Sequence, residues 1–228
     1  MRHENKFVLP WDAYADFQMR LLSSRFFFSE IFEERRVNNI YLDTEGYKNL
    51  YDNLYGVENR TKHRIRWYGV SSSVNQPFLE YKIKHGSLGY KEYYSLPPFT
   101  FDTAFTYSDY LDVIKKDVRK KMALDQLMYR EIMEEVPTLF NTYLRRYYLS
   151  ADGKFRLTID RDLAYSAINR WFDGLPGFRE DKMVVEIKYE NNDLAGAGAI
   201  MQELDLRLTR NSKYVIGMQG LYFNLFSS

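Results

Sequence analysis

The chain has 228 residues, a formal net charge of +1 and no cysteine. The absence of cysteine excludes disulfides, thiolate metal sites and a cysteine nucleophile, and the near-neutral charge argues against a generally basic nucleic-acid-binding protein. Hydrophobic residues make up 45% of the chain and aromatic residues 17%, enough for a sizeable core rich in residues that favour strands.

Strands and short helices alternate in the first part of the chain. The alternation of apolar and charged residues predicts a strand at 2–9, which Pro10 ends before a helix at about 11–22. A strand at 36–44 and a helix at about 46–55 follow, with Gly56 at the expected C-cap. Two strands rich in Arg and Lys and a third at 90–96 complete this part.

The second part begins where Pro97 and Pro98 break the strand pattern. Apolar residues at helical spacing predict one long helix from about 108 to 135. Strand patterns then resume, and the chain from 193 onward indicates helix, with a last helix opening near Lys213. The later strands are expected at 138–149, 155–161 and 183–189.

No repeat, low-complexity stretch or shift of composition marks a boundary, so we expect one domain over residues 1–228. The N-terminal sequence lacks the apolar segment of a signal peptide, and no apolar run approaches the roughly 18 residues of a membrane span. We therefore expect a cytoplasmic protein with no membrane segment.

Several of the predicted strands carry charges on one face only. Residues two apart in a strand point the same way, roughly 6.5–7 Å from each other. The even-numbered positions from Arg60 to Arg66 are all basic, whereas Ile65 and Trp67 between them are apolar. A row of charges of one sign is costly unless an anion lies opposite it. A Glu-x-Lys unit also recurs in three strands, at 4–6, 80–82 and 186–188.

These charged faces predict a closed antiparallel barrel, because closure removes such a face from the outer packing of the sheet. The cations that would share its lumen repel one another unless anions are present, and a polyphosphate fits them. Glutamates on the same faces suit Mg²⁺ or Mn²⁺, so the pattern favours metal-dependent phosphoryl transfer. The cations concerned are Lys6, Arg64, Arg66, Lys82, Lys84, Lys91, Arg145, Arg156 and Lys188.

An ordered set of short motifs runs through essentially the whole chain: R-x-E-x-K, R-x-R-W-Y, L-E-x-K, Y-x-R, F-R-x-T-x-D, V-E-I-K-Y and S-K-Y. In this order they resemble the vacuolar transporter chaperone (VTC) domain of the triphosphate tunnel metalloenzymes, the wider CYTH-like group. The resemblance implies an α+β fold in which eight antiparallel strands form a closed barrel, with helices packed outside. It also implies a polyphosphate polymerase that adds the γ-phosphate of ATP to a polyphosphate chain and depends on Mn²⁺ or Mg²⁺.

The resemblance also implies roles for individual residues. Matched to the motifs, the metal ligands are Glu186 and Glu4, and Tyr143 lines the binding site. The charged-face pattern adds Lys84 to the phosphate ligands. The expected catalytic residues are Arg64, Arg66, Lys82, Arg145 and Arg156, and the remaining triphosphate or polyphosphate ligands are Lys6, Lys91, Lys188 and Lys213.

The implied partners are ATP, polyphosphate and pyrophosphate or triphosphate, with no nucleic acid. Eukaryotic relatives of this family carry a regulatory domain and membrane helices, and the sequence matches neither, which indicates a stand-alone bacterial form. A separate membrane protein would have to supply any coupling to translocation.

Two other functions use the same residues. One is an inorganic or nucleoside triphosphatase of the CYTH type, against which Arg2 argues because an acid is expected there in E-x-E-x-K. The other is a module that binds polyphosphate or nucleotide without turnover. A nucleic-acid-binding module is the weakest alternative, because Trp67, Tyr68 and Phe78 are better explained as core.

Overall fold

The computed structural model describes residues 2–70, 72–85, 88–102, 105–117, 126–168 and 177–223. The chain divides into two compact units. Unit 1 contains Met1–Arg36, Tyr143–Ala164 and Arg179–Ser212. Unit 2 contains Val37–Thr142, Tyr165–Phe178 and Lys213–Ser228.

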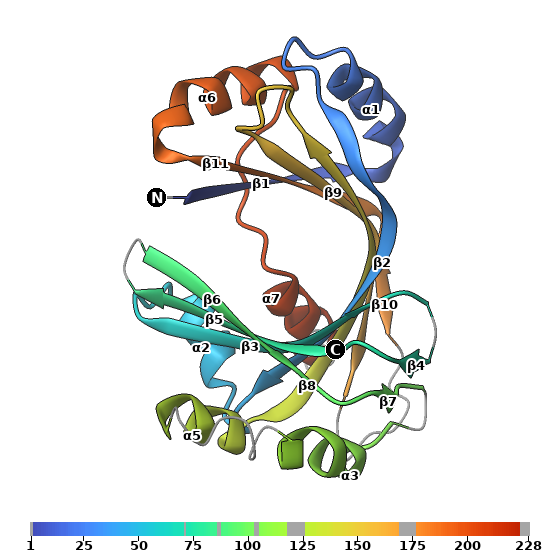
Figure 1. The fold of residues 1–228 in the computed structure, drawn as a ribbon, viewed down its shortest axis with the longest axis vertical. Helices are drawn as coiled ribbons and strands as arrows, with labels where there is room; N and C mark the ends of the chain where they lie inside the picture. Colours follow the sequence, from blue (N-terminus) through green and yellow to red (C-terminus); the bar gives the residue numbers. More distant parts are fainter. Residues whose placement is uncertain are drawn as a thin grey trace. The chain divides into compact units, whose positions relative to one another are not determined.

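Most strands belong to one sheet, in which short and long strands occur together (Figure 1). The pairs β1–β11, β11–β9, β2–β3, β3–β5 and β5–β6 are all antiparallel. The hydrogen-bonded order is β1 (Arg2–Pro10), β11 (Lys182–Glu190), β9 (Arg156–Ala167), β8 (Val136–Leu149), β2 (Ser29–Asp43), β3 (Arg60–Tyr68), β5 (Phe78–His85) and β6 (Leu88–Ser95), with β10 (Phe178–Glu180) beside β9. Strands β4 (Ser73–Val74) and β7 (Phe99–Thr100) form a second, two-stranded sheet.

The prediction of a closed eight-stranded barrel is wrong. The main sheet has nine strands, its order starts at β1 and ends at β6, and no ladder among the described residues joins these two strands. The prediction rested on the need to shield single-sign charges. The structure meets that need locally, because buried carboxylates such as Glu80 and Glu186 lie among the cations of their own unit.

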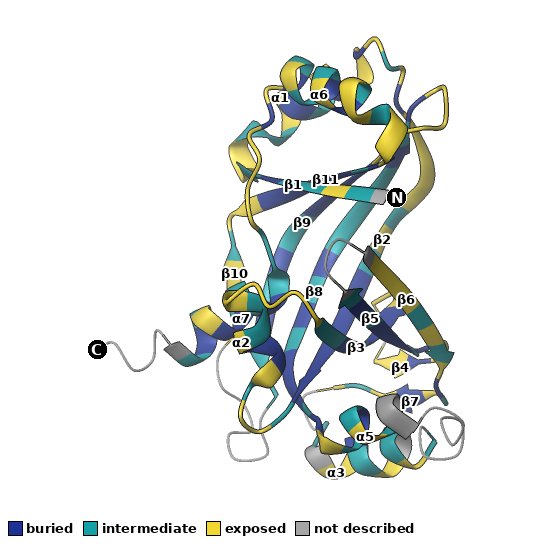
Figure 2. Ribbon diagram, turned by 90° about the vertical axis from the view of Figure 1, so that its left-hand side faces the viewer, coloured by how far each residue is buried: buried dark blue, intermediate teal, exposed yellow. Residues whose placement is uncertain are grey.

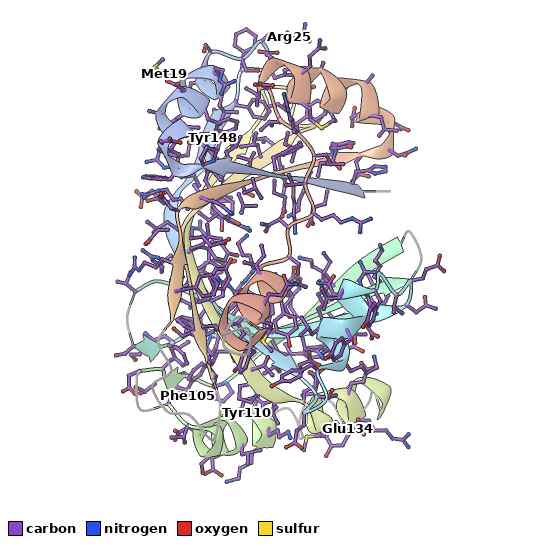
Figure 3. The ribbon with its side chains drawn as sticks, turned by 180° about the vertical axis from the view of Figure 1, so that it is seen from behind. Met19, Arg25, Phe105, Tyr110, Glu134 and Tyr148 are labelled. Carbon is purple, nitrogen blue, oxygen red and sulfur yellow. The ribbon has the colours of Figure 1, made fainter. Side chains whose placement is uncertain are left out.

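Unit 1 has a core between one face of its strands and two helices. Helices α1 (Tyr14–Leu22) and α6 (Leu194–Glu203) lie on the same side of β1, β11 and β9 (Figure 1). Phe7 of β1 and Ile187 of β11 are buried against Phe17 of α1 and Ile200 of α6. Figure 3 shows Tyr148, another member of this core, beside α1. The odd-numbered residues of β1 and β11 thus face the helices, and the even-numbered ones point away.

Unit 2 has a second core, on the face of β3 and β5 that carries their odd-numbered residues. Ile65, Trp67 and Leu79 are buried with Tyr110 and Ile132. The last two come from the π-helix η2 (Tyr110–Lys115) and from α5 (Gln126–Glu134). In Figure 2, the residues of β5 from 78 to 84 have the colours of buried or intermediate positions. The remaining helices are η1 (Trp11–Ala13), α2 (Lys48–Leu54), α3 (Tyr107–Asp109), η3 (Asn191–Asp193), α7 (Lys213–Met218) and η4 (Gln219–Phe223).

Most of the predicted elements are confirmed, but several differ in length. Strand β9 continues to Ala167, whereas the prediction ends it at 161, and the short strands β4, β7 and β10 are not predicted. Strand β2 begins at Ser29 rather than at 36. Its residues 29–33 are all exposed and show no alternation of apolar and polar residues, so the sequence pattern does not reveal them. The long helix predicted at 108–135 is divided into α3, η2 and α5, and the part of it at 118–125 lies outside the described residues. Gly56 has φ +70°, the left-handed conformation expected at the end of α2. In the described parts of the chain, no helix is both long and apolar enough to cross a membrane.

Two glycines of α6 should respond oppositely to the same substitution. Gly198→Ala should raise the free energy of unfolding by about 0.5–1 kcal/mol, because alanine favours helix and a Cβ at 198 would meet nothing within 4 Å. Gly196→Ala gains the same propensity, but its Cβ would lie 2.5 Å from Cζ of the buried Phe155. Overpacking costs about 1–3 kcal/mol, so this variant should melt at or below the wild type. Equal stabilisation in thermal denaturation would contradict the packing of α6.

Candidate functional site

The even-numbered face of unit 1 carries charges of both signs. The register places Lys6 opposite Glu186, Glu4 opposite Lys188, and Lys188 opposite Arg156. Seven of the predicted site residues belong to this unit and, apart from Tyr143 and Arg145 on β8, come from β1, β9 and β11. They are Glu4, Lys6, Tyr143, Arg145, Arg156, Glu186 and Lys188.

Glu186 lies at the centre of this face and is only 6% exposed. Its carboxylate forms salt bridges with Lys188 and with Lys6 Nζ, the latter at 3.6 Å. Glu4 bridges the same two lysines, at 3.1 Å from Lys6 and 3.7 Å from Lys188. Burial by itself would raise the pKa of Glu186, but the charges of Lys6, Lys188 and Arg145 hold that pKa well below its usual range. Glu186 is therefore ionised at neutral pH.

The backbone that follows α6 fixes the position of Lys6. Thr209 donates a backbone hydrogen bond to the Lys6 carbonyl oxygen at 2.9 Å, and Lys6 Nζ donates to the Asn211 carbonyl oxygen at 3.4 Å. The ammonium group is thus held between carboxylates and a carbonyl on the polar side of β1.

Arg145 pairs with Asp160 rather than with a glutamate. Arg145 Nε and Nη2 donate to the two oxygens of Asp160, at 2.5 and 2.7 Å, and Asp160 is fully buried. Burial lowers the pKa of Arg145, but the Asp160 carboxylate outweighs it and raises the pKa above its usual value. The guanidinium also lies over the ring of Tyr143, at 5.2 Å from the centroid. A bidentate pair of this kind fixes the plane of the guanidinium.

Thr158 and Arg156 complete this face on β9. Thr158 lies opposite Glu186 in the register, and its Oγ1 is buried without a hydrogen-bond partner. Arg156 is exposed at the end of the strand. An unsatisfied buried hydroxyl is costly, and it can donate to a phosphate oxygen or to a ligand water.

The face of unit 2 formed by β3, β5 and β6 is strongly basic. One carboxylate, Glu80, shares it with seven cations. They are Arg60, Lys62, Arg64 and Arg66 of β3, Lys82 and Lys84 of β5, and Lys91 of β6. The register therefore brings together all the predicted ligands of these three strands. Lys213, the remaining predicted ligand in unit 2, is the first residue of helix α7.

Glu80 binds three of these cations and is 2% exposed. Its oxygens lie 2.6 Å from Arg64 Nη2, 3.4 Å from Arg66 Nη1 and 3.2 Å from Lys91 Nζ. Burial would raise the pKa of Glu80, but Arg64, Arg66 and Lys91 together hold it well below the usual range. Arg66 is oriented further by its Nε, which donates to Asn39 Oδ1 at 2.8 Å.

Three lysines lie side by side across the strands next to this cluster. Lys62 pairs with Lys82, and Lys82 pairs with Lys91. We call these three residues the lysine row. In the next pair along the strands, Arg60 lies opposite Lys84. Like charges directly opposite each other destabilise a sheet, so this end of the face favours an anionic ligand.

A series of hydrogen bonds and one stacked pair of rings connects the basic face to α7. Arg64 Nη1 donates to the Tyr41 hydroxyl at 3.4 Å, and the Tyr41 ring stacks on Tyr214 with centroids 5.1 Å apart. Tyr214 donates its hydroxyl hydrogen to Asp43 at 2.6 Å. Asp43 is fully buried and also accepts the backbone N–H groups of Asn49 and Leu50 at the start of α2. Lys213, the first residue of α7, precedes Tyr214 in the sequence.

A divalent cation would find two of its ligands in unit 1. Within the residues that the structure describes, no group of three or more His, Asp or Glu side chains is arranged to hold a metal by itself. Glu4 and Glu186, however, converge on the same two ammonium groups and supply hard oxygen ligands. Mg²⁺ typically takes only one or two protein carboxylates and completes its shell with water and substrate phosphates. The pair therefore fits such an ion.

Sequence reasoning did not assign several residues that the structure brings into these sites. The predicted site includes neither Asp160 nor Glu80. It also omits Lys62, although the even-numbered position of this residue is a usable signal. Asn39, Tyr41 and Asp43 gave no signal, because their contacts depend on strands that are distant in sequence.

The family model described as the VTC domain matches residues 1–222, and the chain belongs to this family. A search of curated proteins finds no significant match. Among solved structures, a candidate adenylate cyclase from Vibrio parahaemolyticus aligns with a TM-score of 0.50 and 13% identity, over 94% of this chain and 97% of that one. The PH1819 protein from Pyrococcus horikoshii OT3 aligns with a TM-score of 0.51 and 14% identity, over 96% and 99%. At such identities the likeness shows a shared fold.

HpAC1 from Hippeastrum, a candidate adenylyl cyclase described as having a dominant triphosphatase activity, aligns with a TM-score of 0.48 and 16% identity, over 96% of each chain.

Glu80 should make an acid-dependent contribution to stability. Its pKa is depressed in the folded protein, so the contribution is complete above the unfolded-state value of about 4.3 and is lost as the pH falls below it. Glu80→Gln should lower the free energy of unfolding at pH 7 by about 2–3 kcal/mol, because three cations lose their counter-charge. The difference between variant and wild type should shrink as the pH falls from 5 to 3 in urea denaturation.

Glu58→Gln, at an exposed position of the same unit, is the matched control and should leave the curve unchanged. A constant difference between Glu80→Gln and wild type over this pH range would show that the charge of Glu80 does not stabilise the fold.

Proposed function

We propose that the protein is a metal-dependent polyphosphate polymerase, which transfers the γ-phosphate of ATP to the end of a polyphosphate chain and releases ADP. The observation that carries the proposal is the basic face of unit 2, which includes the lysine row. Membership of the VTC domain family supports the same class of substrate.

The extent of the basic face favours a polymer over a small anion. Arg60 and Arg66 stand at the two ends of the cations on β3. At a rise of about 3.4 Å per residue, six residues separate them by about 20 Å. The three phosphates of ATP cover only part of this length. A flexible polyphosphate chain can contact the cations along the whole length of the face. Arg and Lys side chains bind its phosphate groups by charged hydrogen bonds.

The face of unit 1 supplies a different chemistry, because it has carboxylates as well as cations. Lys6, Lys188 and Arg156 can contact phosphate oxygens, and the Thr158 hydroxyl can donate a further hydrogen bond. Glu4 and Glu186 would hold Mn²⁺ or Mg²⁺. When bound, the ion would neutralise charge on the phosphates of the nucleotide.

The transfer requires positioning and charge neutralisation more than covalent chemistry from the protein. The bond between the γ-phosphorus and the bridging oxygen of ADP breaks, and the γ-phosphorus bonds to a terminal oxygen of the acceptor chain. Within each unit, the arginines and lysines can hold phosphates and stabilise the negative charge that develops on the leaving group. The salt bridges to Glu80 and Asp160 keep the guanidinium groups oriented before the substrate binds.

The proposal is tested by incubating the purified protein with ATP and Mn²⁺. We expect polyphosphate on a gel stained for it, together with ADP in an amount that matches the phosphate incorporated. Lys82→Ala, in the lysine row, should reduce this synthesis about tenfold or more, since a charged hydrogen bond contributes about 1.5–3 kcal/mol. Lys48→Ala on α2 removes an equal charge from an exposed pair with Asp52 and should leave it unchanged.

Free phosphate without polymer would overturn the polymerase in favour of a triphosphatase. Binding of ATP without any turnover would leave a binding module. These two outcomes correspond to the alternatives that the sequence left open.

Glu186→Gln tests the proposed metal ligand. The variant should show lower turnover at limiting Mn²⁺ and recover part of it at high Mn²⁺, because one carboxylate ligand is replaced by a weaker amide oxygen. Turnover is measured as a function of Mn²⁺ concentration, with circular dichroism to verify the fold. Glu33→Gln, at an exposed position of β2, is the control. Full activity of Glu186→Gln at limiting Mn²⁺ would exclude Glu186 as a metal ligand.

A further inference from the structure

Three aromatic side chains lie on the charged face of unit 2, where solvent reaches them. Tyr68 of β3 is 45% exposed and Tyr93 of β6 is 58% exposed, with the partly buried Phe78 of β5 between them. The ring centroids are 6.2 Å apart for Tyr68 and Phe78, and 5.6 Å apart for Phe78 and Tyr93. We call these three residues the aromatic patch.

The position of the patch on the sheet is unusual for aromatic residues. Their strand neighbours Trp67 and Leu79 point to the opposite face and are buried in the core. The patch therefore contributes little to that core, although burying such rings is strongly favourable. Exposed apolar groups gathered on a face rimmed by charges are typical of a binding surface.

The patch continues directly into the cations. Phe78 lies opposite Arg66 in the register, and Tyr93 lies opposite Glu80. Glu80 in turn bridges Arg64, Arg66 and Lys91. Burial raises the pKa of Tyr93, and the charges of Glu80, Arg64 and Arg66 also act on it, which places its hydroxyl within their electrostatic reach. One ligand can therefore contact the rings and the cations at the same time.

We propose that the aromatic patch is a stacking platform for the base of a nucleoside triphosphate whose phosphates extend along Arg66, Arg64 and the lysine row. This inference rests on the proposed function and adds the orientation of the nucleotide. A molecule with a flat aromatic group at one end and several negative charges at the other matches this arrangement of rings and cations on the sheet. Polyphosphate alone has no group for the rings to bind.

Stacking on tyrosine and phenylalanine is tolerant of the base, because every base has a π-face. The patch should therefore accept adenine and guanine with similar affinity. The platform makes ATP bind in one direction, with its γ-phosphate farthest from the patch and nearest the lysine row. Inorganic tripolyphosphate carries the same kind of charge without a base and so serves as the probe that separates the two contributions.

The test compares ATP with tripolyphosphate by titration calorimetry, in EDTA so that no turnover occurs. Tyr93→Ala should weaken ATP binding between about fivefold and a hundredfold, and should change tripolyphosphate binding by less than about twofold. Tyr93→Phe should retain ATP binding, because stacking needs no hydroxyl. Tyr68→Ala is a second variant that should weaken ATP binding in the same selective way.

Tyr90→Ala is the matched control. Tyr90 lies on the same strand as Tyr93 and is 50% exposed, but it pairs with Ile83 and points to the other face. This variant should bind both ligands as the wild type does.

Unchanged ATP affinity in Tyr93→Ala and Tyr68→Ala would overturn the platform while leaving the anion-binding face intact, if tripolyphosphate still binds. An equal loss of ATP and tripolyphosphate binding would also overturn it, because Tyr93 would then support the cations rather than a base. If the wild type binds neither ligand, the proposed function itself fails and the platform fails with it.

Discussion

The structure depends on carboxylates buried among several cations on a strand face. Removing a carboxylate from water is costly, and the cost is recovered only where opposite charges and hydrogen bonds surround it. Glu80 satisfies this condition with Arg64, Arg66 and Lys91, and Glu186 satisfies it with Lys6 and Lys188. Each carboxylate orients cations that would otherwise repel one another. These arrangements make a densely charged face compatible with a folded sheet.

The period of two along the strands divides structural from functional roles. In unit 1, Phe7 and Ile187 face helices α1 and α6. The residues that precede them on the same strands, Lys6 and Glu186, point away from the helices. The helices α1 and α6 pack on the apolar face, so the charged side chains of the other face lie outside that core.

The two charged faces differ in balance, and the difference suggests a division of chemistry. The face of unit 1 has carboxylates and cations in similar number, as suits a metal ion with phosphates. Among the described residues, the face of unit 2 has one carboxylate, Glu80, and seven cations, a balance that favours an anion.

The sequence by itself determined the strands with charged faces, the recurring Glu-x-Lys units and the family, because these depend on local spacing. It also identified most of the cations, since even-numbered Arg and Lys residues stand out in an aromatic strand. Only the tertiary structure decided that Lys62, Lys82 and Lys91 lie abreast, that Asp160 holds Arg145, and that Tyr214 joins Asp43 to the basic face. Among the described residues, the structure shows no ladder between β1 and β6, the first and last strands of the main sheet. The physical reason is that strand register and side-chain pairing arise between segments distant in sequence, and the period within one strand carries no information about its neighbour.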